Sequence, residues 1–224
     1  MPKLKDHILL RIKEMLRHEA LASRENLNPP QAGLLAIQGV GEDRDFMYFK
    51  SDCMYQHCLA RFNYTTYDIR RSQDVINPGT PHRDIMLLAS RADNGEAPIH
   101  PFLYARVLGI YHVNVIYTGQ GSLDNAPRRM EFLWVRWFEY DGGRSVEWAD
   151  LTLNTIRFLP MADERAFGFV DPKSVLRSCH IVPAFARGGA RVDGIGLSRL
   201  AQDAQDWVRY RVNRCVQFCL PPII

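Results

Sequence analysis

The stretch RRMEFLWVRWFEYD, residues 128–141, decides the fold of this 224-residue chain. Between Met130 and Phe138 it carries two tryptophans, two phenylalanines, a leucine, a valine and a methionine, with Arg136 among them. Successive side chains of a strand point to opposite faces, and both alternating sets are apolar in the centre of this stretch. The pattern predicts a central β-strand that is covered on both faces. A buried Arg136 would then need a carboxylate, a carbonyl or a path to water.

Other extended segments, rich in aromatic and β-branched residues, lie on both sides of this strand along the chain. The longest, residues 102–117, alternates with a period of two and predicts a long strand, or two strands that share a bend. Shorter strands are predicted within residues 45–52, 58–69, 84–90, 151–160 and 179–185. Many short strands with glycine bends and long loops favour a mainly β (α+β) fold, in the form of a small, strongly coiled β-barrel.

An N-terminal helix and peripheral helices complete this prediction. Residues 4–21 place apolar side chains at helical spacing, with charged residues between them. Asn, Pro and Gly then interrupt the pattern, so residues 1–34 are predicted to form an amphipathic helix and a linker. Residues 45–220 are predicted to form a single β-rich barrel domain, with a helix at residues 198–206 among its peripheral elements.

Composition restricts the class of protein. Hydrophobic residues make up 46% and charged residues 24% of the chain, which is typical of globular proteins. The net charge of +3 is too small to indicate nucleic-acid binding unless a basic face exists. No apolar run approaches the length of a membrane-spanning helix and no secretory signal is visible, so we expect an intracellular protein without a membrane partner.

Neither the pattern of cysteines nor the search for catalytic motifs indicates cofactor chemistry. Five cysteines are an odd set for a disulfide framework, and the spacings in CMYQHC and CVQFC differ from those of zinc knuckles. The chain has no G-x-S-x-G, Walker A or H-E-x-x-H motif. Cys179 and His180 are neighbours in a predicted strand and would point to opposite faces. We therefore predict no cofactor, no metal and no catalytic residues.

Two groups of residues are candidates for binding. An aromatic rim would use the residues Tyr104, Trp137, Phe138 and Tyr140. Aromatic side chains can enclose a methylated ammonium group or stack on bases, although core packing is the alternative. A basic rim would use the arginines Arg70, Arg71, Arg128 and Arg129. For these, the alternative is that they are solvated charges at strand ends.

Six ordered blocks of the sequence resemble a known family: NYTTYDIRRSQDVINP, DIMLLA, HPFLYARVLGIYHVNVIY, RRMEFLWVRWFEYD, AFGFVDPKSVLRSCHIVPAF and DWVRYRVNRC. The family is an uncharacterised group of proteins of mushroom-forming fungi (basidiomycete type). These often look like the C-terminal part of, or a neighbour to, KDZ- or Plavaka-type transposases. The resemblance spans about residues 45–215 and implies a transposon origin. The chain departs from the family pattern in its ending, CVQFCLPPII, and in lacking a basic run between Asp141 and Ile156.

The order of the strands is also distantly similar to bromo-adjacent homology domains. That similarity implies that Ser174, Val175 and Cys179 to Val182 close a coiled barrel. It also implies a binding role, with chromatin proteins, a transposase or DNA as partners and the nucleus as the compartment. The resulting hypothesis is a non-enzymatic binding module. The alternatives are an accessory domain of a transposase or nuclease, and a degenerate transposon-derived product without a selected activity.

Overall fold

The computed structural model describes residues 2–24, 42–65, 71–89, 100–122, 124–141, 154–191 and 193–213. Across these residues the fold is mainly β, as predicted, with one α-helix. Internal contacts divide the chain into two compact units. Unit 1 comprises Met1–Gln56 and Tyr111–Glu131, and unit 2 comprises His57–Ile110 and Phe132–Ile224. The predicted division into residues 1–34 and a single domain at 45–220 stays a prediction.

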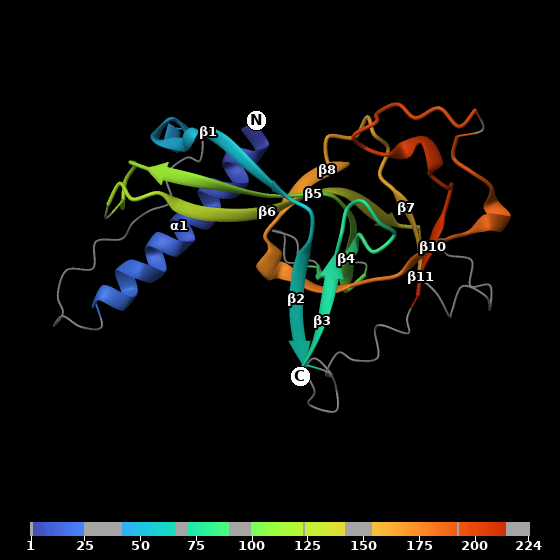
Figure 1. Ribbon diagram of the computed structural model, residues 1–224, viewed down its shortest axis with the longest axis horizontal. Coiled ribbons are helices and arrows are strands. Elements are labelled where there is room, and N and C mark those ends of the chain that lie inside the picture. The colour runs from blue at the N-terminus through green and yellow to red at the C-terminus, as the bar shows by residue number, and fades with distance from the viewer. Residues whose placement is uncertain are drawn as a thin grey trace. The chain divides into compact units, whose positions relative to one another are not determined.

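Unit 1 contains α1 (Pro2–Arg24), η1 (Glu42–Phe46), nearly all of β1 (Met47–His57) and parts of β5 and β6 (Figure 1). The predicted helix is confirmed, and five of its apolar positions are buried: Leu4, Ile8, Leu9, Ile12 and Leu16. Polar contacts fix the helix in this unit, since Arg11 donates to the carbonyl of Glu131 at 2.6 Å. Most of the predicted linker lies outside the described residues. No helix of the described residues is long and apolar enough to cross a membrane.

Unit 2 contains the remaining strands and the rest of β5 and β6. Backbone hydrogen bonds join the strands of the chain into a hairpin and a larger sheet (Figure 1). The hairpin pairs β2 (Ala60–Thr65) with β3 (Arg71–Ile76). The larger sheet consists of β4 (Asp84–Leu88), β5 (Phe102–Tyr117), β6 (Arg128–Tyr140), β7 (Asn154–Phe158), β8 (Phe167–Val170), β9 (Val175–Ser178), β10 (Ile181–Pro183) and β11 (Tyr210–Val212), together with β1. Its neighbours are antiparallel in every pair whose register is known.

The two ends of this sheet meet in one short piece of chain. The strand order is β10-β11-β7-β6-β5-β4-β9, and only Cys179 and His180 separate β9 from β10. Both residues continue the pairing: Cys179 N donates to the Asp84 carbonyl, and Asn213 N donates to the His180 carbonyl, each at 2.9 Å. The curled sheet therefore closes through residues 175–183, in agreement with the predicted small β-barrel.

The opening stretch forms β6, and both of its faces are buried in the centre as predicted. On one face Leu133 and Val135 join a cluster with Ile85 and Val107. On the other face Phe138 packs in a second cluster with Met86, Tyr104, Ile156 and Tyr210. Arg136 is 5% exposed, so the charge in the middle of this stretch lies inside the fold.

The helix predicted at residues 198–206 is wrong. This segment forms turns and a single 3-10 turn, η5 (Asp203–Gln205). Gln202 has a left-handed backbone with φ of 54°, which ends any α-helix that begins at Ser198. Similar short 3-10 turns, η3 (Pro172–Ser174) and η4 (Phe185–Arg187), are the other peripheral helical pieces of this unit within the described residues.

Candidate functional site

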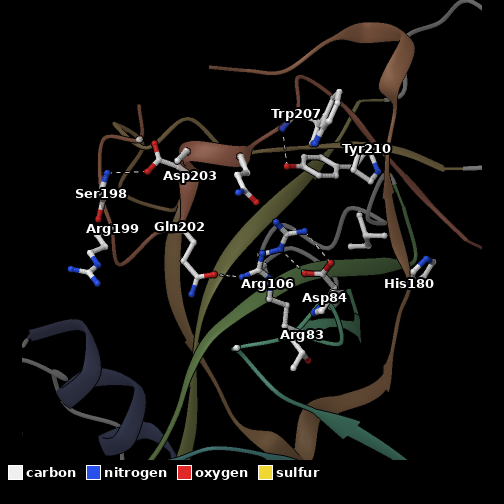
Figure 2. Close-up of a pocket in the computed structure, with 18 residues that line it drawn as sticks. Arg83, Asp84, Arg106, His180, Ser198, Arg199, Gln202, Asp203, Trp207 and Tyr210 are labelled. Carbon is white, nitrogen blue, oxygen red and sulfur yellow. Dashed lines mark hydrogen bonds and ion pairs between the residues drawn. The ribbon is translucent and has the colours of Figure 1, made fainter. Parts of the chain in front are cut away.

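A cleft of about 730 Å³ opens in unit 2 (Figure 2). Its lining comes from the turn before β4, from Arg106 on β5, from the start and end of β10, and from the segment between Gly196 and Tyr210. These pieces are far apart in the sequence and are brought together by the closure of the sheet. Both polar and aromatic side chains face the cleft, which is a combination typical of ligand sites.

An ion pair forms one wall of the cleft. Asp84 and Arg106 are direct partners in the register of β4 and β5. Arg106 Nε lies 2.8 Å from Asp84 Oδ1, and Arg106 Nη2 lies 3.1 Å from Asp84 Oδ2. The Arg106 guanidinium also lies 5.0 Å from the ring centre of Phe158 and 5.5 Å from that of Tyr210. Burial of Arg106 opposes its charge, but the neighbouring Asp84 raises the pKa of Arg106, so the guanidinium keeps its charge.

The buried Arg136 forms a second ion pair, with Asp206. Its Nη1 lies 2.5 Å from Asp206 Oδ2, and its guanidinium lies 3.9 Å from the ring centre of Phe158. Tyr210 donates to the other Asp206 oxygen at 3.3 Å and accepts from Trp207 N at 2.9 Å. Burial raises the pKa of Asp206, although Arg136 partly offsets this effect. Burial also raises the pKa of Tyr210 to about 12, so its hydroxyl stays protonated.

The segment on the opposite side of the cleft is organised by Asp203, which is 1% exposed. Its carboxylate accepts from Leu197 N at 2.8 Å and from Ser198 N at 2.9 Å. Although burial opposes the charge, these amide hydrogen bonds lower the pKa of Asp203. Gly196 is required here because a Cβ at this position would lie 2.8 Å from Ala204 N. The segment is therefore held in a defined shape without an α-helix.

Two further arginines, Arg83 and Arg199, line the cleft. The half-buried Arg83 donates to the neutral side chain of Gln202, as Figure 2 shows. Burial and the neighbouring charge of Arg106 lower the pKa of Arg83, although Asp84 acts in the opposite direction. Arg199 is exposed at the edge of the cleft. The lining contains three arginines and two aspartates, and both aspartates are already engaged, so the cleft is cationic.

The residues of the predicted aromatic rim lie in different environments. Tyr104 and Phe138 are buried at 3% and 6% exposure, and Phe138 stacks on Phe158 with 4.0 Å between ring centres. Trp137 is half-buried and packs against the cluster on the opposite face of β6. Tyr140 is exposed and stacks on His100, which also lies near Tyr104. Core packing therefore occupies most of this set.

The residues of the predicted basic rim fall into both units. Arg70 lies outside the described residues. Arg71 is exposed at the start of β3 in unit 2. Arg128 and Arg129 belong to unit 1, where Arg128 pairs with Glu19 and Asp124 and Arg129 pairs with Glu131. Both of these arginines therefore have carboxylate partners within unit 1.

The thiols and acidic residues show no metal centre in the part of the chain that the structure describes, where no group of three or more His, Cys, Asp or Glu could hold an ion. Cys53 and Cys58 are exposed, and Cys215 and Cys219 lie outside the described residues. Burial raises the pKa of Cys179 well above its usual range, which makes this thiol a poor nucleophile.

Sequence reasoning missed the residues that line the cleft, notably Arg83, Gln202 and Trp207. The available signal was a charged residue within an apolar strand, which Arg106 and Arg136 both provide. Such a charge must be paired when it is buried, but the sequence does not say with what. Comparison with known proteins supplies no further assignment: no family model matches the chain, and no curated protein or solved structure is significantly similar to it.

Proposed function

We propose that this chain is a non-enzymatic binding module of transposon origin that recognises a segment of a chromatin protein in the nucleus. The observation that carries the binding role is the cationic cleft of unit 2, whose walls are fixed by buried ion pairs. The transposon origin rests on the six sequence blocks. The lack of the G-x-S-x-G, Walker A and H-E-x-x-H motifs and the protonated state of Cys179 favour binding over catalysis.

The shape and charge of the site favour a protein segment over duplex DNA. DNA-binding proteins usually present a broad basic surface that follows many phosphates. In the cleft, Arg106 is held in a pair with Asp84, which leaves Arg83 and Arg199 as the arginines of the lining that can meet a ligand. A concave site with aromatic residues and a few charges suits an extended peptide instead.

The apolar residues beside the cleft also suit a peptide. Phe185 packs edge-on against Trp207, with 4.9 Å between ring centres, and is itself 65% exposed. Leu197 and Leu200 flank the lining residues Ser198 and Arg199 and are about 70% exposed. Neighbouring exposed apolar residues are frequent at protein-binding surfaces. A bound segment would bury them while it occupies the cleft.

A direct test compares the binding of nucleosomes, free DNA of the same length and histone tail peptides by fluorescence anisotropy. Ala204→Trp places a large side chain at an exposed position of the cleft lining and should weaken binding about ten-fold or more. Ala126→Trp makes the same exchange at an exposed position of unit 1 that does not line the cleft, and it should bind like the wild type. Equal binding of free DNA and nucleosomes, or an unaffected Ala204→Trp variant, would contradict the proposal.

A further inference from the structure

Arg83 is a half-buried cation of the cleft that has no carboxylate partner among the described residues. Asp84, the acidic neighbour of Arg83 in the chain, directs both of its oxygens to Arg106. Within the described residues, the side-chain partner of Arg83 is the amide oxygen of Gln202, which carries no charge. An arginine that is half-buried beside another arginine gains more from an anion than from an amide. The same burial and the same neighbour lower the pKa of Arg83 from its ordinary value.

The cations differ in their freedom to move. Arg106 is held by two hydrogen bonds to Asp84 and by three aromatic rings, and its side chain is only 12% exposed. Among the described residues, the Arg83 side chain donates one hydrogen bond, to Gln202, an exposed residue with a left-handed backbone. Arg199 is exposed at the edge. A ligand can therefore recruit Arg83 and Arg199 by displacing only a neutral amide, while the Asp84–Arg106 pair stays in place.

We infer that the cleft recognises an oxyanion on the bound protein segment, with Arg83 leaving Gln202 to pair with it and Arg199 approaching from the edge. The inference rests on the proposed peptide-binding function and specifies its ligand. A phosphorylated serine or threonine fits this site best because it carries close to two negative charges and three acceptor oxygens for the fork of an arginine. A glutamate or aspartate is the weaker ligand of the same chemistry.

The ligand should also carry apolar residues next to the oxyanion. Ile195, Leu197 and Leu200 lie in the same segment as Arg199, and each is 68–70% exposed. Asp203 fixes this segment through the amides of Leu197 and Ser198. The apolar side chains are therefore presented on a defined backbone close to the cationic site. This arrangement predicts an anion anchored in the cleft, with flanking apolar side chains on Leu197 and Leu200.

The test uses the full chain and three degenerate peptide libraries with one fixed central residue: phosphoserine, aspartate or serine. Fluorescence anisotropy at constant ionic strength should show binding in the order phosphoserine, aspartate, serine, with about ten-fold or more between the first and the last. A DNA oligonucleotide of higher charge serves as a fourth probe and should bind more weakly than the phosphoserine library. Stronger binding of the DNA would overturn the inference in favour of a nucleic acid.

Two variants connect the binding to Arg83. Gln202→Glu gives Arg83 a permanent carboxylate partner, so it should abolish the preference for phosphoserine while the fold becomes no less stable. Gln73→Glu adds the same charge on β3, outside the lining of the cleft, and should keep the preference. Arg83→Gln should lose the preference as well, whereas Arg157→Gln, at a half-exposed surface pair, should not.

The outcomes separate the inference from the function on which it rests. If the three libraries bind equally well, and Gln202→Glu does not change their binding, the oxyanion inference fails and peptide recognition stands. If no library binds at any concentration tested, the proposed peptide-binding function fails. If the phosphoserine preference survives in both Gln202→Glu and Arg83→Gln, recognition occurs elsewhere on the chain and the assignment to this cleft is refuted.

Discussion

The Arg136–Asp206 pair is the contact whose removal should have the largest effect on stability. Arg136 is 5% exposed, and its Nε has no hydrogen-bond partner among the described residues, so Asp206 supplies most of its compensation. Asp206→Asn leaves a buried guanidinium without a counter-charge. We expect it to lower the free energy of unfolding by about 3–5 kcal/mol, which is the usual cost of breaking a buried pair from one side.

A double variant separates the effect of the unpaired charge on stability from the effect of lost packing. Arg136→Met with Asp206→Asn removes both charges and keeps an apolar side chain against Phe158, so it should cost less than Asp206→Asn alone. Arg157→Met is the surface control, because Arg157 and its partner Glu139 are 53% and 33% exposed and such pairs contribute about 0–1 kcal/mol. Urea denaturation followed by tryptophan fluorescence measures the free energy of unfolding of the wild type and of these three variants. A loss below about 1 kcal/mol in Asp206→Asn, or a double variant that is less stable than Asp206→Asn alone, would refute the reasoning.

Three further predictions follow from the same structure. The raised pKa of Tyr210, about 12, means that the folded state keeps a phenol proton that the unfolded chain loses near pH 10. Stability should therefore fall by about 2–3 kcal/mol between pH 10 and 12, and urea titrations of Tyr210→Phe should lack that part of the fall. Gly196→Ala should destabilise the segment by about 1–3 kcal/mol and weaken peptide binding, whereas Gly189→Ala, outside the cleft lining and with a Cβ that would meet Arg191 O and Asp206 O at an ordinary 3.8 Å, should do neither. Trp137→Ala should lower the free energy of unfolding by about 3 kcal/mol because Trp137 packs on the core. If the variant instead loses peptide binding at unchanged stability, Trp137 belongs to an aromatic binding rim.

The strands were predictable because their signal is local. Alternation in β6 is sufficient to show a strand covered on both faces, and the burial of residues 132–138 agrees with it. The N-terminal helix follows in the same way from its apolar spacing. The segment at residues 198–206 has a helical pattern as well, but its conformation depends on the tertiary contacts of Asp203 and on the close approach of Gly196 to Ala204. The spacing of apolar residues along the chain does not reveal these tertiary contacts.

The site was not predictable because its contacts join distant parts of the chain. Asp84 lies in a sequence typical of a turn, where a local backbone bond is the usual role of aspartate. In the fold its side chain instead pairs with Arg106 across two strands. The aromatic residues were predicted to form a binding rim because they are numerous and close in sequence, but most of them pack in the hydrophobic core. The polar residues of the cleft are few and scattered, and the closure of the sheet is what assembles them.

Three arginines of the strands with little exposed surface each pair with an aspartate, whereas Arg83 contacts a neutral amide. Arg106, Arg136 and Arg177 each pair with an aspartate, at sequence separations of 22, 70 and 103 residues respectively. Because a buried charge without a counter-ion is costly, each pair fixes which segments lie together as the sheet closes. Arg83, half-buried beside Arg106, has a neutral amide instead. If stability alone had shaped this position, a glutamate in place of Gln202 would complete the pattern. A glutamine there keeps Arg83 available to an external anion, so Gln202→Glu should give a protein at least as stable as the wild type that no longer prefers the phosphorylated ligand.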